Sequence, residues 1–170
     1  MIDSCLRAGG SVDLSGLGLN CSAAPMDGSL AVTGTWSANS EGIVSDNTHT
    51  FGDATFQIPE ECSHTVPALC PRFDDVLPPI LGYASLACVD STVEWCACAA
   101  TAEQTGGMGL VSSSPITNGS YTTADGVLIV SDGTNHTEYS YCSFENTLTL
   151  SLKSARRTGT VTGTILLQKR

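Results

Sequence analysis

The last third of the sequence is a series of short strand-like runs separated by turn pairs. The runs are SYTTA, VLIVS, TEYSYCSF, TLTLSL and TVTGTILLQ, rich in residue types that favour strands. Asp125-Gly126, Asp132-Gly133, Glu145-Asn146 and the link 154–158 join them in a way typical of hairpins. In TLTLSL the leucines alternate with Thr and Ser, which buries one face of the strand. This pattern predicts an antiparallel meander.

The first part of the chain continues the strand pattern. LAVTGTW (30–36) predicts one strand, and GIVSDNTHTFGDATFQIP (42–59) predicts two or three, broken at Asp46-Asn47 and at Gly52-Asp53. TVEWCACA (92–99) predicts another strand, and residues 102–119 read as a long loop. The sum is an all-β chain with about eight or nine strands joined mainly as a meander, which favours an up-and-down barrel over a sandwich.

A chain of 170 residues suits a single domain. Residues 1–28 are rich in Gly, Ser and Ala and are expected to form an N-terminal arm, followed by a barrel over 29–170. Within the barrel, 60–91 is expected to be an insertion or lid, because five of the seven prolines lie in it or at its edge. Proline at this density suppresses strand ladders and long helices, although ILGYASLAC (80–88) is compatible with one or two helical turns.

Eight cysteines, an even number, indicate disulfides formed in an oxidising compartment, so we expect a secreted or extracytoplasmic protein. Cys96 and Cys98 share one face of a strand, and each can pair with a different neighbouring segment. The expected pairs are Cys62 with Cys70 and Cys5 with Cys21, leaving Cys88, Cys96, Cys98 and Cys142 to form the other two bonds.

Metal and redox alternatives for the cysteines fit poorly. Cys96-x-Cys98 and Cys62-x-His64 do not match the ligand spacing of a zinc ribbon or knuckle. A redox dithiol would have two residues between its cysteines at a helix start. The sequence therefore predicts no metal and no cofactor.

The charge pattern separates an acidic body from a basic end. The net charge is −10, which argues against nucleic acid as a partner. Five of the seven Lys and Arg residues follow residue 152, whereas no Asp or Glu follows Glu145. We expect a basic final hairpin lying against an acidic body; a patch facing an anion or a membrane is the alternative.

Targeting signals are not visible in the sequence. No apolar run reaches the length of about 18 residues that a membrane span needs. The start MIDSCLRAGG lacks the basic head and apolar core of a signal peptide, so we expect that an export signal preceded it.

Two short motifs resemble those of the lipocalins. Gly34-Thr35-Trp36 resembles their Gly-x-Trp signature, and Thr137-Glu138-Tyr139 resembles their Thr-Asp-Tyr motif. The resemblance implies an eight-stranded calycin barrel that encloses a small apolar ligand, with Trp36 closing its base. It also implies a basic side chain stacked over the tryptophan, from Lys169 and Arg170 or from Arg156 and Arg157. The Pro- and Cys-rich segment and the missing C-terminal helix depart from that family.

A looser resemblance joins the C-terminal part to other proteins. EYSYC, NTLTL and GTVTGTI are similar to the endings of cysteine-rich extracytoplasmic lipoproteins of myxobacteria and related bacteria. It implies location rather than activity, with an outer-membrane lipoprotein as the native form.

Catalytic constellations are weak, and we expect the protein not to be an enzyme. His49, His64 and His136 are the only histidines, and no Gly-x-Ser-x-Gly elbow is present. Glu60-Glu61 and Asp74-Asp75 are adjacent pairs whose side chains diverge in extended chain, so neither is a ready acid/base couple. A weak calcium site at Asp74 and Asp75 stays an alternative.

The aromatic residues mark the expected ligand site. Trp36, Tyr83, Tyr121, Tyr139 and Tyr141 are the candidates for lining a cavity, although an outer tyrosine-bearing surface is equally compatible with the pattern. The leading function is non-enzymatic binding of a small apolar or amphipathic ligand. A structural or adhesive cell-surface protein acting through protein contacts is the first alternative, and a hydrolase is the second.

Overall fold

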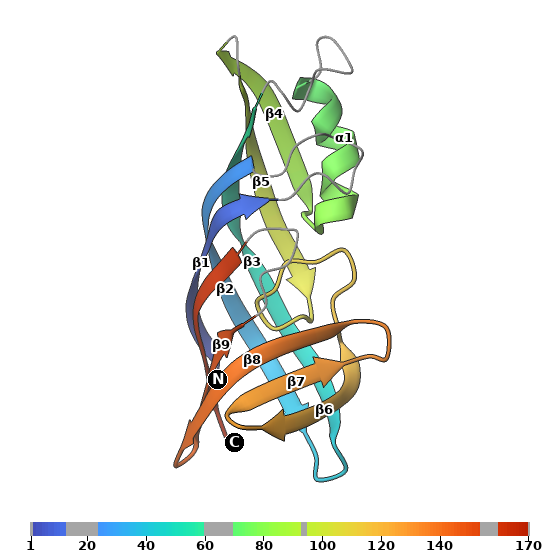
Figure 1. Cartoon of the computed structure of the whole chain (residues 1–170), viewed down its shortest axis with the longest axis vertical. Helices are drawn as coiled ribbons and strands as arrows, with labels where there is room; N and C mark the ends of the chain where they lie inside the picture. Colours follow the sequence, from blue (N-terminus) through green and yellow to red (C-terminus); the bar gives the residue numbers. More distant parts are fainter. Residues whose placement is uncertain (1, 13–23, 60–69, 93–94, 154–159, 170) are drawn as a thin grey trace.

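Ten antiparallel strands and one helix make up the parts of the chain that the computed structural model describes, residues 2–12, 24–59, 70–92, 95–153 and 160–169 (Figure 1). In chain order these are β1 (Ile2–Val12), β2 (Ala24–Ala38), β3 (Ile43–Pro59), α1 (Cys70–Leu81), β4 (Ser85–Thr92), β5 (Trp95–Thr105), β6 (Asn118–Ala124), β7 (Val127–Ser131), β8 (His136–Phe144), β9 (Thr147–Leu152) and β10 (Thr160–Gln168). The predicted all-β antiparallel class is confirmed.

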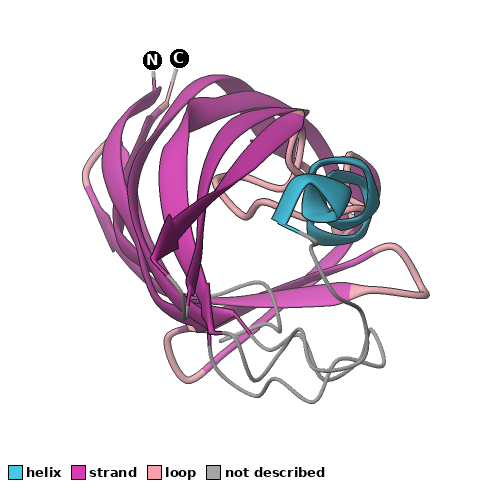
Figure 2. Cartoon of the chain, turned by 90° about the horizontal axis from the view of Figure 1, so that it is seen from above, coloured by secondary structure: helices cyan, strands magenta, loops and turns pink. Residues whose placement is uncertain are grey.

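Eight of the strands pair in a circuit. β2 pairs with β1 on one edge and with β3 on the other, and β3 pairs with β6. From β6 to β10 each strand pairs with the next in sequence, and β10 pairs with β1. Seen from above, the strands lie around a common axis (Figure 2). The side chains of alternate residues therefore face a shared interior.

The strand β3 is continuous over 17 residues, where the sequence predicted two or three strands. At Gly52, φ is +152° and β2 comes so close that a Cβ would collide with the carbonyl oxygen of Ser29. The glycine therefore serves a close approach between strands rather than a turn. The second edge of β3 is divided, because Ile43–Ser45 pair with β6 and His49–Pro59 pair with β5.

Residues 2–12, predicted to lie in an N-terminal arm, form β1 instead. This strand has partners on both edges, so that Cys5 lies opposite Ala31 of β2 and Thr164 of β10. Its Gly, Ser and Ala content has little strand propensity of its own, and pairing on two sides overrides that weak signal. Residues 13–23 of the predicted arm lie outside the described residues.

The Pro-rich segment contains the helix α1 and the strand β4. The sequence predicted one or two helical turns at 80–88 in an insertion or lid, but the helix lies earlier, at 70–81, and residues 85–88 belong to β4. α1 contains Pro78 and Pro79 near its C-terminal end. Its buried face carries Phe73, Leu77 and Leu81 at a spacing of four residues, and the helix packs against β4. This packing stabilises a helix whose prolines would disfavour it in isolation. Residues 60–69 lie outside the described residues.

The predicted hairpins at Asp125-Gly126, Asp132-Gly133 and Glu145-Asn146 are confirmed. β9 pairs with β10 as predicted, and their link, residues 154–158, lies outside the described residues. β7, β9 and β10 begin and end at the predicted residues. Asp125 and Gly126 both have positive φ (50° and 74°), as does Glu145 (51°). These are the turn conformations for which the Asp-Gly and Glu-Asn pairs were predicted.

Two disulfides join β5 to two neighbouring segments. The prediction that Cys96 and Cys98 pair with different segments is confirmed. Cys96 bonds to Cys70 at the start of α1, and Cys98 bonds to Cys88 of β4. The predicted pairing of Cys62 with Cys70 is wrong, because Cys70 lies beside Cys96, with 5.5 Å between their Cα atoms, and is bonded to it.

The prediction that Cys142 pairs with Cys88, Cys96 or Cys98 is also wrong. Cys142 is a free, exposed thiol on the outer face of β8, whereas Cys96 and Cys98 are buried on the inner face of β5. The side chains of Cys5, Cys21, Cys62 and Trp95 lie outside the described residues.

The loop between β5 and β6, residues 106–117, turns into the interior. Its apolar side chains Met108, Leu110, Val111 and Ile116 are buried. Gly106 N–H donates to the Thr48 carbonyl (2.7 Å), and Gly109 N–H donates to the Thr50 hydroxyl (3.2 Å). Burial of each apolar side chain stabilises the fold by roughly 1.5–3 kcal/mol. The predicted long loop is therefore part of the core.

Candidate functional site

Trp36 lies on the inner side of β2 near the end at which β6 and the β8–β9 hairpin are found (Figure 1). Its ring meets that of Tyr121 edge to face, with 6.5 Å between centroids and 63° between planes. The indole Nε1 is buried and has no hydrogen-bond partner among the residues that the structure describes. Such an orphan donor is rare in native structures and calls for a partner, such as a ligand or an ordered water.

A cavity of about 330 Å³ opens beside Trp36. Its apolar wall is formed by Trp36, Leu148 and Leu167, and its polar wall includes Glu145, Asn146 and Lys169. These residues come from β2, the β8–β9 hairpin and the end of β10, where Lys169 N–H donates to the Asn146 carbonyl over 2.7 Å. The volume lies within the range of small-molecule sites. An apolar wall beside two opposite charges suits an amphipathic molecule.

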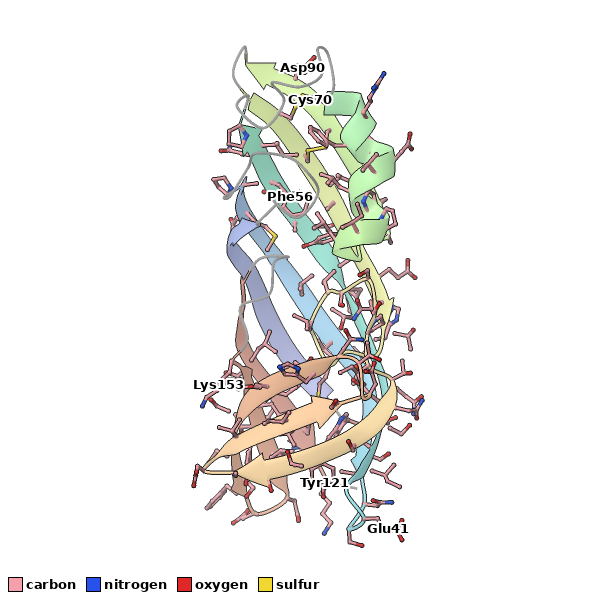
Figure 3. The ribbon with its side chains drawn as sticks, turned by 45° about the vertical axis from the view of Figure 1, so that its right-hand side comes forward. Glu41, Phe56, Cys70, Asp90, Tyr121 and Lys153 are labelled. Atoms are coloured by element: carbon pink, nitrogen blue, oxygen red, sulfur yellow. A yellow bond between two sulfur atoms is a disulfide. The ribbon has the colours of Figure 1, made fainter. Side chains whose placement is uncertain are left out.

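The five predicted aromatic residues do not form one site. Tyr121 joins Trp36, and its hydroxyl donates to the Asn39 carbonyl over 3.0 Å near Glu41 (Figure 3). Tyr141 is partly buried and packs against the core.

Tyr139 and Tyr83 lie in the core. Tyr139 is buried, and its hydroxyl lies 3.4 Å from the Gly107 carbonyl, so it contacts the inward loop. Tyr83 packs edge to face on Phe56 under α1, with its hydroxyl donating to the Met26 sulfur. Burial raises the pKa of Tyr83 to about 12. Its role here is packing.

The cavity wall outside β2 went largely unrecognised in the sequence. Ser143, Glu145 and Asn146 were treated as strand and turn residues, and nothing in their pattern indicates a cavity. Lys169 is different, because the lipocalin resemblance placed it with Trp36. Both line the same cavity in the structure. Arg156, Arg157 and Arg170 lie outside the described residues.

Asp46 is the buried carboxyl of the interior, and it lies opposite Trp36 in the β2–β3 ladder. Thr48 N–H donates to its Oδ1 over 2.9 Å. Burial raises the pKa of Asp46, and hydrogen bonds from Thr48 and the backbone of Met108 and Gly107 offset only part of that rise. The carboxyl thus holds the inward loop near the cavity.

Gln104 holds the other side of the loop. Its amide Nε2 donates to the carbonyls of Gly106 (2.9 Å) and Leu110 (2.7 Å), and its Oε1 accepts from Ser112 N–H (2.8 Å). Gly106, Gly107, Met108 and Gly109 all have positive φ, which makes this turn dependent on its glycines. The buried side chains of the loop fill part of the interior.

One cluster has metal-ligand atoms close together, at the end of the molecule opposite Tyr121 (Figure 3). Cys70, Asp90 and Cys96 lie within 4.8 Å of one another. The two sulfurs are bonded to each other, so neither is a thiolate ligand. This group is therefore a disulfide with a neighbouring carboxylate.

The other polar candidates lie away from the cavity. His49 stacks on Phe51 on the outer side of β3, and His136 is exposed at the start of β8. Asp74 accepts the N–H of Cys88 over 2.6 Å, whereas Asp75 is exposed, so the two carboxylates considered for calcium do not act together. His64, Glu60 and Glu61 lie outside the described residues.

Comparisons with models of protein families, with curated proteins and with solved structures find no match to this chain. Among the described residues, no helix has the length and apolar character needed to cross a membrane. The site has to be interpreted from its own geometry.

Proposed function

We propose that this chain is an extracytoplasmic, non-enzymatic protein that binds a small amphipathic ligand at the Trp36 end of a lipocalin-like barrel. The barrel is the circuit of eight paired strands, β1–β3 and β6–β10. The observation that carries the proposal is the cavity of about 330 Å³ beside Trp36. The extracytoplasmic location is supported by the two disulfides.

The cavity chemistry supports a ligand with an apolar body and a polar head. The ring of Trp36 and the side chains of Leu148 and Leu167 receive the apolar body. The head lies at the rim with Lys169, Glu145 and Asn146, and it brings an acceptor for the unpaired indole N–H. A volume of about 330 Å³ favours a short molecule over a long lipid chain.

The alternative of a surface protein acting through protein contacts also has support. Phe144 is 73% exposed at the end of β8, directly before the hairpin that borders the cavity. Val76 and Ile80 are exposed on the outer side of α1. Aromatic side chains such as Phe are enriched at protein–protein interfaces. The hydrolase alternative lacks such support, because no histidine among the described residues lines the cavity.

The test is a fluorescence titration with the amphipathic probe 8-anilinonaphthalene-1-sulfonate. In the Trp95→Phe background Trp36 is the only tryptophan, so energy transfer from it to the probe reports binding at this end. We expect saturable energy transfer. Ser143→Phe, which fills the cavity, should lower the affinity for the probe at least tenfold. The control Thr122→Phe adds the same group on an exposed part of β6 and should leave transfer unchanged. Absence of saturable transfer, or equal effects of both variants, would contradict the proposal.

A further inference from the structure

The outer side of the sheet carries a stacked aromatic pair. On β3 the even-numbered residues are mostly buried, and the odd-numbered ones face outward. Phe51 is 43% exposed, and its ring stacks with that of His49 at 6.0 Å between centroids and 28° between planes. Phe51 lies opposite Ala31 of β2, whose small side chain leaves the ring face uncovered on that side. The pair is thus an accessible aromatic platform.

Three carboxylates lie on the same outward face as this platform. Glu103 of β5 lies directly opposite Phe51, and Asp53 follows Phe51 on the same outward face. Side chains directly opposite in an antiparallel ladder have Cβ atoms roughly 4.5–5.5 Å apart. Asp27 of β2 adds a third exposed carboxylate, opposite Thr55. We call these five residues, His49, Phe51, Asp27, Asp53 and Glu103, the aromatic–acidic face.

The strands β2, β3, β4 and β5 contain no Lys and no Arg. Arg7 of the adjoining strand β1 lies opposite Ser29 of β2, which in turn lies opposite Asp53 of β3. Arg72 lies on α1, which packs against β4 and buries Phe73 and Leu77 in the core. The aromatic–acidic face therefore presents a negative ring quadrupole and three carboxylates in one direction.

We propose that the aromatic–acidic face docks a basic segment of a partner protein. One Arg or Lys side chain lies over the Phe51 ring and pairs with Glu103, and a second pairs with Asp53. A cation over an aromatic ring is attracted to its face, and adjacent carboxylates add charge-assisted hydrogen bonds. A second copy of the chain is a poor occupant, because two bodies of net charge −10 repel each other. The same charge disfavours nucleic acid and anionic lipid.

This site is separate from the Trp36 cavity, so its test is independent of the proposed ligand. The probe is a fluorescently labelled ten-residue peptide of alternating Arg and Gly, titrated by anisotropy at low and at moderate salt. Phe51→Ala leaves the net charge unchanged and should weaken binding about two- to fivefold, the range for an exposed cation–π contact. The double variant Glu103→Gln/Asp53→Asn should weaken it further and reduce the salt dependence.

A charge-matched control separates docking from general attraction to an acidic protein. Asp125→Asn/Asp132→Asn also removes two negative charges, but at the β6–β7 and β7–β8 turns. This control should change the affinity much less than the double variant Glu103→Gln/Asp53→Asn does. The proposal is overturned if Phe51→Ala binds like the parent protein, or if the two double variants weaken binding equally. Because all five substituted residues are exposed, circular dichroism should show unchanged folding in each variant.

Discussion

Cys88 and Cys98 lie directly opposite each other on β4 and β5, with 4.0 Å between their Cα atoms and a bond between their sulfurs. Two residues earlier on β5, Cys96 is bonded to Cys70 of α1. One face of a single strand therefore fixes both an edge strand and the helix that covers it. This arrangement holds α1 on the sheet despite its two internal prolines.

Removal of each disulfide should destabilise the protein in an order set by loop length. Closing 26 residues (Cys70–Cys96) restricts the unfolded chain more than closing 10 (Cys88–Cys98). We expect losses in the free energy of unfolding of about 3.5 kcal/mol for Cys70→Ala/Cys96→Ala and about 3 kcal/mol for Cys88→Ala/Cys98→Ala. Urea denaturation measures both, and Cys142→Ala, at the exposed free thiol, is the control with no expected change. Equal stability of all three variants would show that the bonds are incidental.

The hairpins from residue 118 to 168 were predictable because their signals are local. An Asp-Gly pair between two alternating runs fixes turn, register and buried face at once. β3, by contrast, contains turn-like pairs at Asp46-Asn47 and Gly52-Asp53, yet it forms one continuous strand. Its course is decided by β2, which pairs with it from Met26 to Ala38 and approaches most closely at Gly52.

The same difference between local and long-range signals decides which residues of the candidate site were predictable. Trp36 was predictable from Gly34-Thr35-Trp36, and its neighbour Tyr121 from its aromatic character. The remaining cavity wall is assembled from a hairpin tip at Glu145-Asn146 and from the end of β10. Their proximity depends on the register in which β9 pairs with β10, which no turn pair in the sequence fixes. The inward turn of residues 106–109 depends likewise on Gln104 and Asp46, two polar residues that a sequence pattern places on strands without a partner.

Asp46→Asn should change the pH dependence of stability. Because the folded-state pKa of Asp46 is raised, the folded protein binds this proton more tightly than the unfolded chain does. The associated stabilisation is complete below the ordinary pKa of 3.8 and is lost as pH rises through the raised value. Asn imitates the protonated form, so the variant should be close to the parent at pH 3.5 and gain relative stability at pH 7. Thermal or urea unfolding at both pH values measures this difference.

Asp132→Asn is the control of opposite sign. Hydrogen bonds from Asn135 and Thr134 lower the pKa of this exposed carboxyl, with backbone donation from Asn135 as the largest cause. Its stabilisation is present above the ordinary pKa and is lost as pH falls through the lowered value. The variant should therefore lose relative stability at pH 7 and not at the lowest pH. If both variants shift in the same direction, burial is not what distinguishes Asp46.

Asp74→Ala should expose the free edge of the sheet. The strand β4 is the last in the strand order, and its Cys88 N–H is covered by the Asp74 carboxylate at 2.6 Å. Loss of this partly buried hydrogen bond should cost about 1–2 kcal/mol and leave the Cys88 N–H unpaired at the sheet edge. Urea denaturation measures the first effect, and sedimentation velocity at rising concentration measures the edge pairing that follows. Asp75→Ala removes one negative charge at an exposed position and should cause neither the loss of stability nor the self-association. Self-association of both variants would show that the lower net charge, and not the exposed edge, causes it.

Gln104→Leu should release the inward loop. The substitution keeps a buried side chain of similar size but removes one acceptor and two donor contacts. It strands the carbonyls of Gly106 and Leu110 and the N–H of Ser112. At roughly 1–3 kcal/mol for each stranded buried group, we expect a loss in the free energy of unfolding of about 3 kcal/mol or more. Hydrogen exchange should accelerate at Gly106 and Gly107 before the rest of the sheet, because the loop opens locally. The neighbouring exposed Thr105→Ala should stay within about 0.5 kcal/mol of the parent. Unchanged exchange at Gly106 in Gln104→Leu would mean that apolar burial of Met108 and its neighbours holds the loop without the amide.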